Sequence, residues 1–285
     1  MVDRVAFCVT TFMRPAALGR LLASIAEHVP AARVHVADQG GGLDDAGYDR
    51  LWRDLRARGL LYRPVVERLP FDCGVSAARN RLVDLAPGEF KLILDDDFVF
   101  TADTRVERFV ALLDHRPDAG VVGGRVTRDG DENRFDLRFE RAGGLLREVP
   151  EDGPFLSHDG IRYREADCVV NFALMRAEVF ERVRWDPRLK IAEHEDFFLR
   201  LLDTPFRVLH TPDVTVDHPP PDLDGDYPSF RNRPEFVVTS MVKHGLHRVE
   251  TVNGLVAELD AERLVLRLPG GGALVHSRRG SAGST

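Results

Sequence analysis

The stretch FKLILDDD, residues 90–97, decides how this sequence is interpreted. Residues 90–94 are a short, mostly apolar run of the length expected for a buried strand, and three aspartates follow directly. Neighbouring carboxylates repel one another, so a fold that gathers them at a strand end is stabilised by a bound cation. Hard oxygen ligands suit Mg²⁺ or Mn²⁺, which retain water and share substrate phosphates. The alternative is a solvated acidic turn, and the apolar strand in front favours the metal site.

On the N-terminal side of this stretch, strand patterns alternate with helix patterns. Short apolar runs predict strands over residues 5–10, 34–38 and 60–66. Apolar residues at helical spacing predict helices over residues 15–29, 48–55 and 76–85. Strands that alternate with helices of this length pair in parallel through right-handed crossovers. We therefore expect a doubly wound α/β sheet with parallel strand pairing.

On the C-terminal side the pattern is less regular. Helices are predicted over 106–113, 193–202 and 235–245, and strands over 121–126, 169–175, 208–211 and 214–216. Residues 127–165 are polar, glycine-rich and without a long period, which indicates a hairpin-bearing insertion or a lid over the site. Residues after 251 alternate weakly and predict strands, and residues 278–285 have the composition of a disordered tail.

Polar residues follow three of the predicted strands. Thr10, Asp38 and the aspartates from Asp95 onward all stand at predicted carboxyl ends. Ligands of doubly wound sheets bind at that edge, so these side chains are expected to share one site.

Composition excludes several classes of protein. The 285 residues contain 39 basic and 46 acidic side chains, and this net charge of −7 argues against a nucleic-acid partner. Three cysteines without a CxxC pair make a disulfide framework or a finger-type zinc site improbable. We find no apolar run of the ~20 residues that a transmembrane segment needs. The first residues lack the pattern of a signal peptide, so a cytoplasmic protein is expected.

Two enzyme families place an acidic group at such a strand end. Asp95, Asp97 and Val99 fit the DxDx[TV] motif of haloacid dehalogenase-like phosphatases. That chemistry also needs a distant lysine and a later acidic pair on the same sheet. Lys190 and Lys243 are the downstream lysines, and neither lies in a convincing motif.

The second family matches more of the chain. VTTFMRP at 9–15, Asp38, DCGVSAARN at 72–80, the aspartate triplet and AEHEDFFLR at 192–200 stand in the order found in GT-A-fold, family-2-like glycosyltransferases. The sequence resembles this family from residue 5 to residue 218, and more weakly its β-1,4-N-acetylgalactosaminyltransferase branch. The resemblance implies the GT-A α/β fold, a Rossmann-like, mixed but mainly parallel sheet flanked by helices. The departures include Met13 at a position where many relatives are polar, and Gln39 where they carry an acidic residue.

The resemblance implies a metal-dependent, inverting glycosyltransferase that uses a nucleotide sugar, most simply a UDP-sugar, and a glycan or small-molecule acceptor. It assigns Asp196 as the general base, with Glu195 beside it. The residues expected at the nucleotide sugar are Thr10, Phe12, Arg14, Asp38, Arg79, Asp95 and Asp96. Those expected at Mn²⁺ or Mg²⁺ are Asp97, His218 and Asp95, and those expected at the acceptor are Asn171, Trp185 and His194.

Physical chemistry supports two of these assignments separately. A carboxylate at Asp38 supplies the acceptor that a uracil imide N–H needs, and a turn or helix cap is the alternative. The planar guanidinium of Arg79 offers a donor fork for a base or a diphosphate, and a surface ion pair is the alternative.

The expected organisation is one GT-A domain over 1–250, with a nucleotide-sugar-binding half at 1–126 and an acceptor-side half at 127–250. A C-terminal extension covers 251–277 and a disordered tail 278–285. A GT-A-like scaffold that binds sugars without catalysis is a further alternative, which loss of the acidic triplet or of the base would favour.

Overall fold

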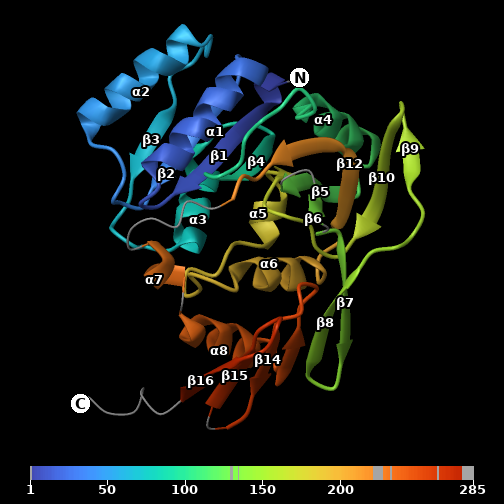
Figure 1. Cartoon of the computed structure of the whole chain (residues 1–285). Coiled ribbons are helices and arrows are strands. Elements are labelled where there is room, and N and C mark those ends of the chain that lie inside the picture. The colour runs from blue at the N-terminus through green and yellow to red at the C-terminus, as the bar shows by residue number, and fades with distance from the viewer. Residues whose placement is uncertain are drawn as a thin grey trace.

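The computed structural model describes residues 2–128, 131–133, 135–220, 227–231, 233–261 and 263–277. They form two sheets, and helices flank the larger one on both sides (Figure 1). Its strand order is β3-β2-β1-β4-β11-β5-β12-β10-β9, and β6 pairs with β5 outside this path. The expected disordered tail, 278–285, lies outside the described residues.

The N-terminal half has the expected alternating order. Its strands are β1 (Val5–Thr11), β2 (Arg33–Asp38), β3 (Val65–Arg68) and β4 (Phe90–Asp95), and all pair in parallel. Its helices are α1 (Pro15–His28), α2 (Asp45–Ala57) and α3 (Val75–Leu85). The third strand begins at Val65 rather than at residue 60, because Pro64 has no N–H to donate to a ladder.

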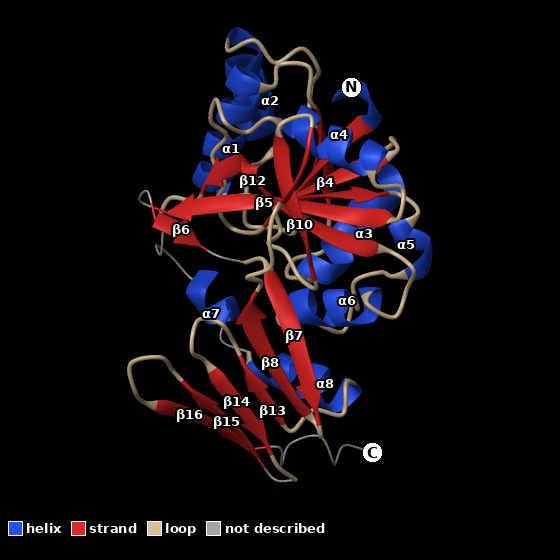
Figure 2. Ribbon diagram, turned by 90° about the vertical axis from the view of Figure 1, so that its right-hand side faces the viewer, coloured by secondary structure: helices blue, strands red, loops and turns tan. Residues whose placement is uncertain are grey.

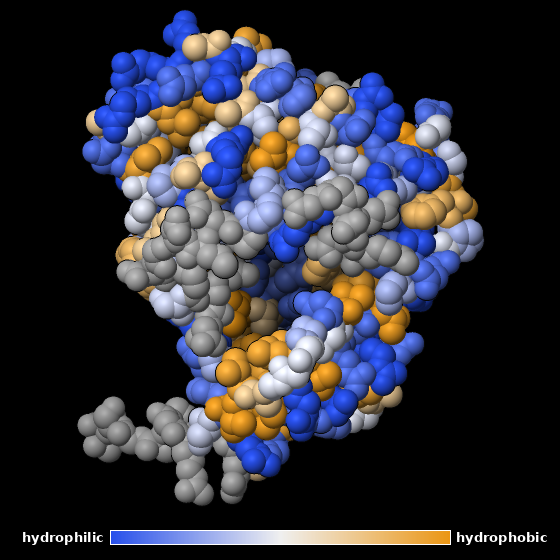
Figure 3. Space-filling model, viewed as in Figure 1, coloured by the Kyte–Doolittle hydropathy of each residue, from blue (hydrophilic) through white to orange (hydrophobic). Residues whose placement is uncertain are grey.

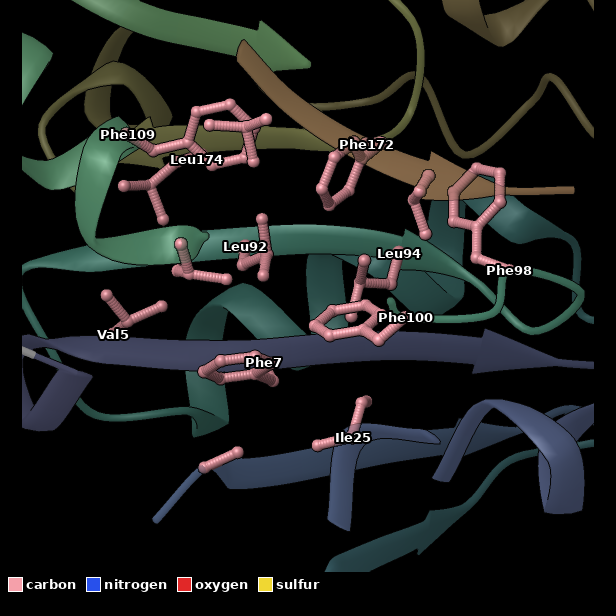
Figure 4. Packing of buried hydrophobic residues seen from close by; sticks show 14 of the residues in the cluster. Val5, Phe7, Ile25, Leu92, Leu94, Phe98, Phe100, Phe109, Phe172 and Leu174 are labelled. Atoms are coloured by element: carbon pink, nitrogen blue, oxygen red, sulfur yellow. The ribbon is translucent and has the colours of Figure 1, made fainter. Parts of the chain in front are cut away.

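Alternating side chains of the large sheet bury both of its faces. On one face, Phe7 of β1 and Leu92 of β4 pack with α1, α2 and α4 (Val106–His115). On the other, Cys8 and Ile93 pack with α3, α5 (Val179–Arg182) and α6 (Glu193–Leu201). Figure 4 shows the first of these cores, where Phe172 lies among other aromatic rings. The helices therefore cover both faces, as a doubly wound fold requires.

The later strands of the large sheet run in mixed directions. They are β5 (Ala119–Arg128), β6 (Asp131–Asn133), β9 (Leu156–His158), β10 (Ile161–Ala166), β11 (Ala173–Arg176) and β12 (Arg207–Asp217). β11 is antiparallel to both neighbours, whereas β12 is parallel to β5. The two strands expected over 208–211 and 214–216 are one strand, β12, with a register shift between His210 and Thr215.

A second sheet lies beside the first, as the turned view of Figure 2 shows. Its order is β16-β15-β14-β13-β8-β7. The strands are β7 (Leu137–Ala142), β8 (Leu145–Pro150), β13 (Arg248–Glu250), β14 (Val256–Leu259), β15 (Arg263–Arg267) and β16 (Ala273–Ser277). α8 (Pro234–Lys243) contributes Met241 to the small core of this unit, together with Leu146 and Leu264.

This second sheet joins segments that the sequence treats separately. The hairpin β7–β8 comes from the expected insertion at 127–165, and β8 pairs in parallel with β13. The boundary expected after residue 250 falls between β13 and β14, which pair with each other. Residues 251–277 are thus part of a sheet that begins in the middle of the chain. Over the described residues, no helix has the length and apolar character needed to cross a membrane.

Candidate active site

A cavity of about 440 Å³ lies at the carboxyl ends of the parallel strands. Figure 3 shows this face of the molecule hollowed at its centre. The ends of β1 and β4, the start of α3, the start of α6 and the end of β12 all reach the cavity. Its lining includes Thr10, Thr11, Phe12, Arg14, Gln39, Asp72, Gly74, Arg79, Asp95, Asp96, Asp97, Arg128, Asn171, Lys190, Glu193 and His218. Thr10 and the aspartates from Asp95 onward therefore line one cavity, whereas Asp38, which was expected to share the site, does not line it.

The second and third aspartates of the triplet face Arg14. Asp96 accepts from the Thr11 hydroxyl at 2.7 Å and from the Arg14 guanidinium, and Asp97 accepts from Arg14 at 2.7 Å. Burial raises the pKa of Asp96 to about 7, although the charge of Arg14 and the hydrogen bond from Thr11 oppose this. Burial alone would also raise the pKa of Asp97, but the hydrogen bond from His218 and the charge of Arg14 hold it well below its usual range.

Asp97 and His218 form a pair suited to a divalent cation. The His218 Nε2 atom lies 3.4 Å from an Asp97 oxygen, and Arg128 approaches the other ring nitrogen, Nδ1, at 2.9 Å. Among the described residues, no group of three or more His, Cys, Asp or Glu side chains is arranged to hold a metal. A carboxylate and an imidazole still fit Mn²⁺ or Mg²⁺, because such ions complete their shell with water and substrate phosphate. Two side chains of this kind beside a cavity fit that requirement.

The first aspartate of the triplet belongs to a different network. Arg79 donates to Asp95 at 2.9 Å and to Glu193 at 2.9 Å, and thereby joins β4 to the start of α6. Asn171 donates to the other Asp95 oxygen at 3.4 Å, and its own oxygen lies 2.9 Å from His194 Nδ1. Glu193 is not among the site residues expected from the sequence, although it is the first residue of the helix predicted over 193–202.

The structure does not bring Asp196 to the cavity. This carboxylate, fully buried, contacts His244 at 2.8 Å, Lys243 at 2.6 Å and Arg200 at 2.6 Å. Burial would raise its pKa, but hydrogen bonds from His244, Lys243 and Arg200 lower the pKa of Asp196 to about 2. These partners lie on α6 itself and at the end of α8. Asp196 therefore connects α6 to the end of α8, the helix that packs against the second sheet.

The other residues expected on the acceptor side have varied positions. Burial raises the pKa of Glu195, which is not among the cavity-lining residues. His194 lies behind Asn171, with its Nε2 atom 3.4 Å from the Cys168 sulfur. Trp185 is buried and stacks on Phe197 with ring centroids 4.6 Å apart. Of the expected acceptor residues only Asn171 lines this cavity.

Asp38 and Gln39, at the end of β2, point to different surroundings. Asp38 accepts from Gly40 N–H and from the Tyr48 hydroxyl, both at 2.9 Å, and it is buried outside the cavity lining. Gln39, which replaces the acidic residue of many relatives, lines the cavity instead. Thr10, Phe12, Arg14, Arg79, Asp95 and Asp96, which were also expected at the nucleotide sugar, line it as well.

An aromatic group and a charged group border the cavity. Phe12 contacts Phe71 and, on α7 (Tyr227–Arg231), Phe230, with ring centroids 5.2 and 5.1 Å apart. Asp72 accepts from Lys190 and Arg233, each at 2.8 Å. Gly74 has φ +96°, and a Cβ there would lie 2.8 Å from the Lys190 side chain. The glycine is thus needed for the close approach of the loop before α6.

The fold is thus a doubly wound α/β sheet whose cavity is bordered by an acidic strand end and by a carboxylate at the start of the facing helix. The family model for Glycosyl transferase family 2 matches residues 6–184. The chain belongs to that family. This membership sets the phosphatase alternative aside.

Curated relatives agree with this assignment. The chain is 33% identical over 219 residues to the human protein "Beta-1,4 N-acetylgalactosaminyltransferase 1", which covers 73% of this chain and 37% of that protein. It is 30% identical over 244 residues to the mouse "Beta-1,4 N-acetylgalactosaminyltransferase 2", covering 80% and 43%. The chain thus spans less than half the length of these relatives.

Solved structures share the fold. S. aureus TarS 1–349 in complex with UDP-GlcNAc has a TM-score of 0.58 at 16% identity, covering 81% of this chain and 61% of that one. GalNAc-T7 with UDP, GalNAc and Mn²⁺ has a TM-score of 0.58 at 16% identity, covering 76% and 44%. The GT-A architecture expected from the sequence is confirmed.

Proposed function

We propose that this glycosyltransferase moves a sugar from a UDP-sugar to an acceptor hydroxyl with inversion, and that the transfer depends on a divalent metal. The observation that carries the proposal is the convergence of Asp97, His218 and Glu193 on one cavity at the strand ends. A metal–diphosphate site and a carboxylate base are the two parts that single displacement at a sugar requires.

The donor part of the cavity suits a nucleoside diphosphate. Asp97 and His218 would hold Mn²⁺ or Mg²⁺, which when bound offsets the charge of the departing diphosphate. The side-chain amide of Gln39 offers both a donor and an acceptor to a uracil edge. The bound ligands named for TarS and GalNAc-T7, and the names of the curated relatives, support UDP-N-acetylhexosamines as the first donors to test.

Glu193 is the proposed general base in place of Asp196. The acceptor oxygen attacks the anomeric carbon on the side opposite the diphosphate. As that bond forms, the bond from the sugar to UDP breaks and the hydroxyl proton passes to the Glu193 carboxylate. Glu193 lines the cavity and is 9% exposed, whereas Asp196 is fully buried and is held by Arg200, Lys243 and His244.

The test is a transfer assay with matched controls. UDP release from UDP-GalNAc and UDP-GlcNAc is measured with a panel of glycoside acceptors, in Mn²⁺ and in EDTA. We expect acceptor-dependent release that EDTA abolishes and a product with the anomeric configuration opposite to that of the donor. Retained configuration would refute inversion, and release that is unchanged in EDTA would refute metal dependence.

The variant Asp97→Ala tests the ligand assignment in the same assay. It removes one of two protein ligands, and we expect UDP to lose its Mn²⁺-dependent binding in isothermal titration. Asp213→Ala is the matched control, because this aspartate pairs with Arg162 away from the cavity. Mn²⁺-dependent UDP binding that survives in Asp97→Ala would contradict the assignment.

A further inference from the structure

Arg79 is an unusual arginine because its two terminal nitrogens join carboxylates from distant parts of the chain. Its side chain is only 2% exposed. One nitrogen donates to Asp95 at the end of β4, and the other donates to Glu193 at the start of α6. The planar fork of a guanidinium suits this double contact, whereas an ammonium is a single point charge.

The guanidinium is held from behind by an aromatic stack. The Arg79 Cζ atom lies 5.5 Å from the Trp185 ring centroid, and Trp185 stacks on Phe197 of α6. The next residue, Asn80, accepts from the Trp185 N–H at 3.1 Å and donates to the Trp185 carbonyl at 2.8 Å. One turn of α3 therefore fixes both the arginine and the ring behind it.

This packing limits what Arg79 can reach. Both of its terminal nitrogens are engaged by carboxylates, and its buried Nε atom has no hydrogen-bond partner within the described part of the chain. Asp95 is also held by Asn171 on its other oxygen. A direct contact of Arg79 with diphosphate would require at least one of the two ion pairs to open. The arrangement favours a role that acts through Glu193.

We propose that Arg79, supported by Trp185, is a positioning residue that orients the Glu193 carboxylate toward the acceptor and ties it to the donor-side Asp95. This inference rests on the proposed function, since it assumes that Glu193 accepts the proton. It differs from the sequence-based expectation that Arg79 contacts the nucleotide directly. It also gives Trp185 a structural reason to be buried beside α6.

The two roles predict different kinetics. If Arg79 positions Glu193, Arg79→Lys should lower kcat by about 10–100-fold, the range typical for residues that orient a functional ligand. The KM for the UDP-sugar should stay within about threefold, because the donor is not touched. If Arg79 binds the diphosphate, the KM and the Kd of UDP should rise instead.

A double-mutant cycle tests the coupling. Arg79→Lys, Glu193→Gln and the double variant are compared in single-turnover transfer, with UDP affinity measured by titration. We expect the double variant to transfer at the rate of Glu193→Gln within about threefold, because residues that act as a unit are strongly non-additive. Multiplicative losses, or a loss of UDP affinity that accompanies Arg79→Lys in both backgrounds, would overturn the proposal.

Controls separate this inference from folding and from the proposed function. Arg81 lies on the same helix, is exposed and pairs with Glu67. The variant Arg81→Lys should therefore leave kcat and the KM for the UDP-sugar unchanged. If Arg79→Lys does not fold, Trp185→Phe keeps a ring behind the guanidinium with less area. The proposal requires a lower kcat at unchanged KM for that variant, and unchanged kcat would refute it. Absence of transfer by the unaltered chain counts against the proposed function, not against the Arg79 coupling alone.

Discussion

Glu193 and Asp196 stand three residues apart on α6, yet their surroundings differ in every respect that matters for catalysis. Glu193 opens on the cavity and has one cationic partner, Arg79. Asp196 is enclosed by Arg200, Lys243 and His244 and does not line the cavity. A buried carboxylate held by two cations and an imidazole has little capacity to take a proton from an acceptor, whereas a carboxylate at a cavity wall can contact an acceptor hydroxyl.

The comparison shows that position along a helix determines the role of an acid more than its neighbours in sequence do. The first residue of α6 projects from the helix end toward the strand ends. The residue one turn later leans against α8, which carries Lys243. Catalysis and attachment of the second sheet are thus expected to depend on different acids of the same short motif.

The largest expected effect is on transfer in Glu193→Gln. The amide keeps the size of the side chain but removes the proton acceptor, so the single-turnover rate should fall by about 10²–10⁴-fold. UDP titration should give an affinity within about twofold of the unaltered chain, because the change is on the acceptor side. An equal fall in UDP affinity and rate would place Glu193 at the donor instead.

Asp196→Asn should act on stability. Removing one partner of a buried charge group leaves the other charges uncompensated, so unfolding in urea should show a loss of about 3 kcal/mol. Transfer by the fraction that remains folded should be near normal. A stable variant with strongly reduced transfer would return Asp196 to the mechanism.

The pH dependence of stability also tests whether Asp196 stabilises the fold. The pKa of Asp196 is lowered from 3.8 to about 2 in the folded state. Its contribution to the free energy of unfolding is therefore present above pH 4 and is lost as the pH falls toward 2. The shift corresponds to about 2 kcal/mol. Urea unfolding between pH 5 and pH 2 should therefore fall less steeply in Asp196→Asn than in the unaltered chain. Parallel curves would show that Asp196 does not carry this dependence.

The smallest expected effect is that of Lys243→Met, which removes one of the three partners of Asp196 and one of the two cationic partners of Asp186, which keeps Arg188. Arg200 and His244 remain, so the loss should be about 1 kcal/mol. Arg81→Met, at an exposed ion pair, is the matched control and should change stability by less than about 0.5 kcal/mol. A loss for Lys243→Met as small as that of the control would show that α8 is not clamped through this lysine.

Local patterns in the sequence predict the N-terminal half well. β1, β2 and β4 are short apolar runs followed by polar residues, so their burial and the edge at which they end follow from period and length. The second sheet is not predictable in the same way. β8 pairs with β13, about a hundred residues later, and no local periodicity records such a long-range pairing.

The candidate site, like the fold, can be predicted from the sequence only in part. Thr10, Asp95 and Asp97 follow from strand ends alone, and the cavity contains all three. Which of Glu193 and Asp196 faces the cavity cannot be predicted from the sequence, because it depends on the packing of α8 against the buried side of α6. Asp38 similarly turns to Tyr48, a contact made by the next helix. In each case a tertiary partner, not the local motif, determines which carboxylate faces the cavity.

Glu193, and not Asp196, is the acid proposed to take the acceptor proton, and a single assay on two variants distinguishes them. Single-turnover transfer from a UDP-sugar is measured for Glu193→Gln and Asp196→Asn side by side, below the unfolding temperature of both. We expect Asp196→Asn to transfer faster than Glu193→Gln by at least about 100-fold, the lower end of the contribution of a general base. A ratio near one, or a slower Asp196→Asn, would contradict it.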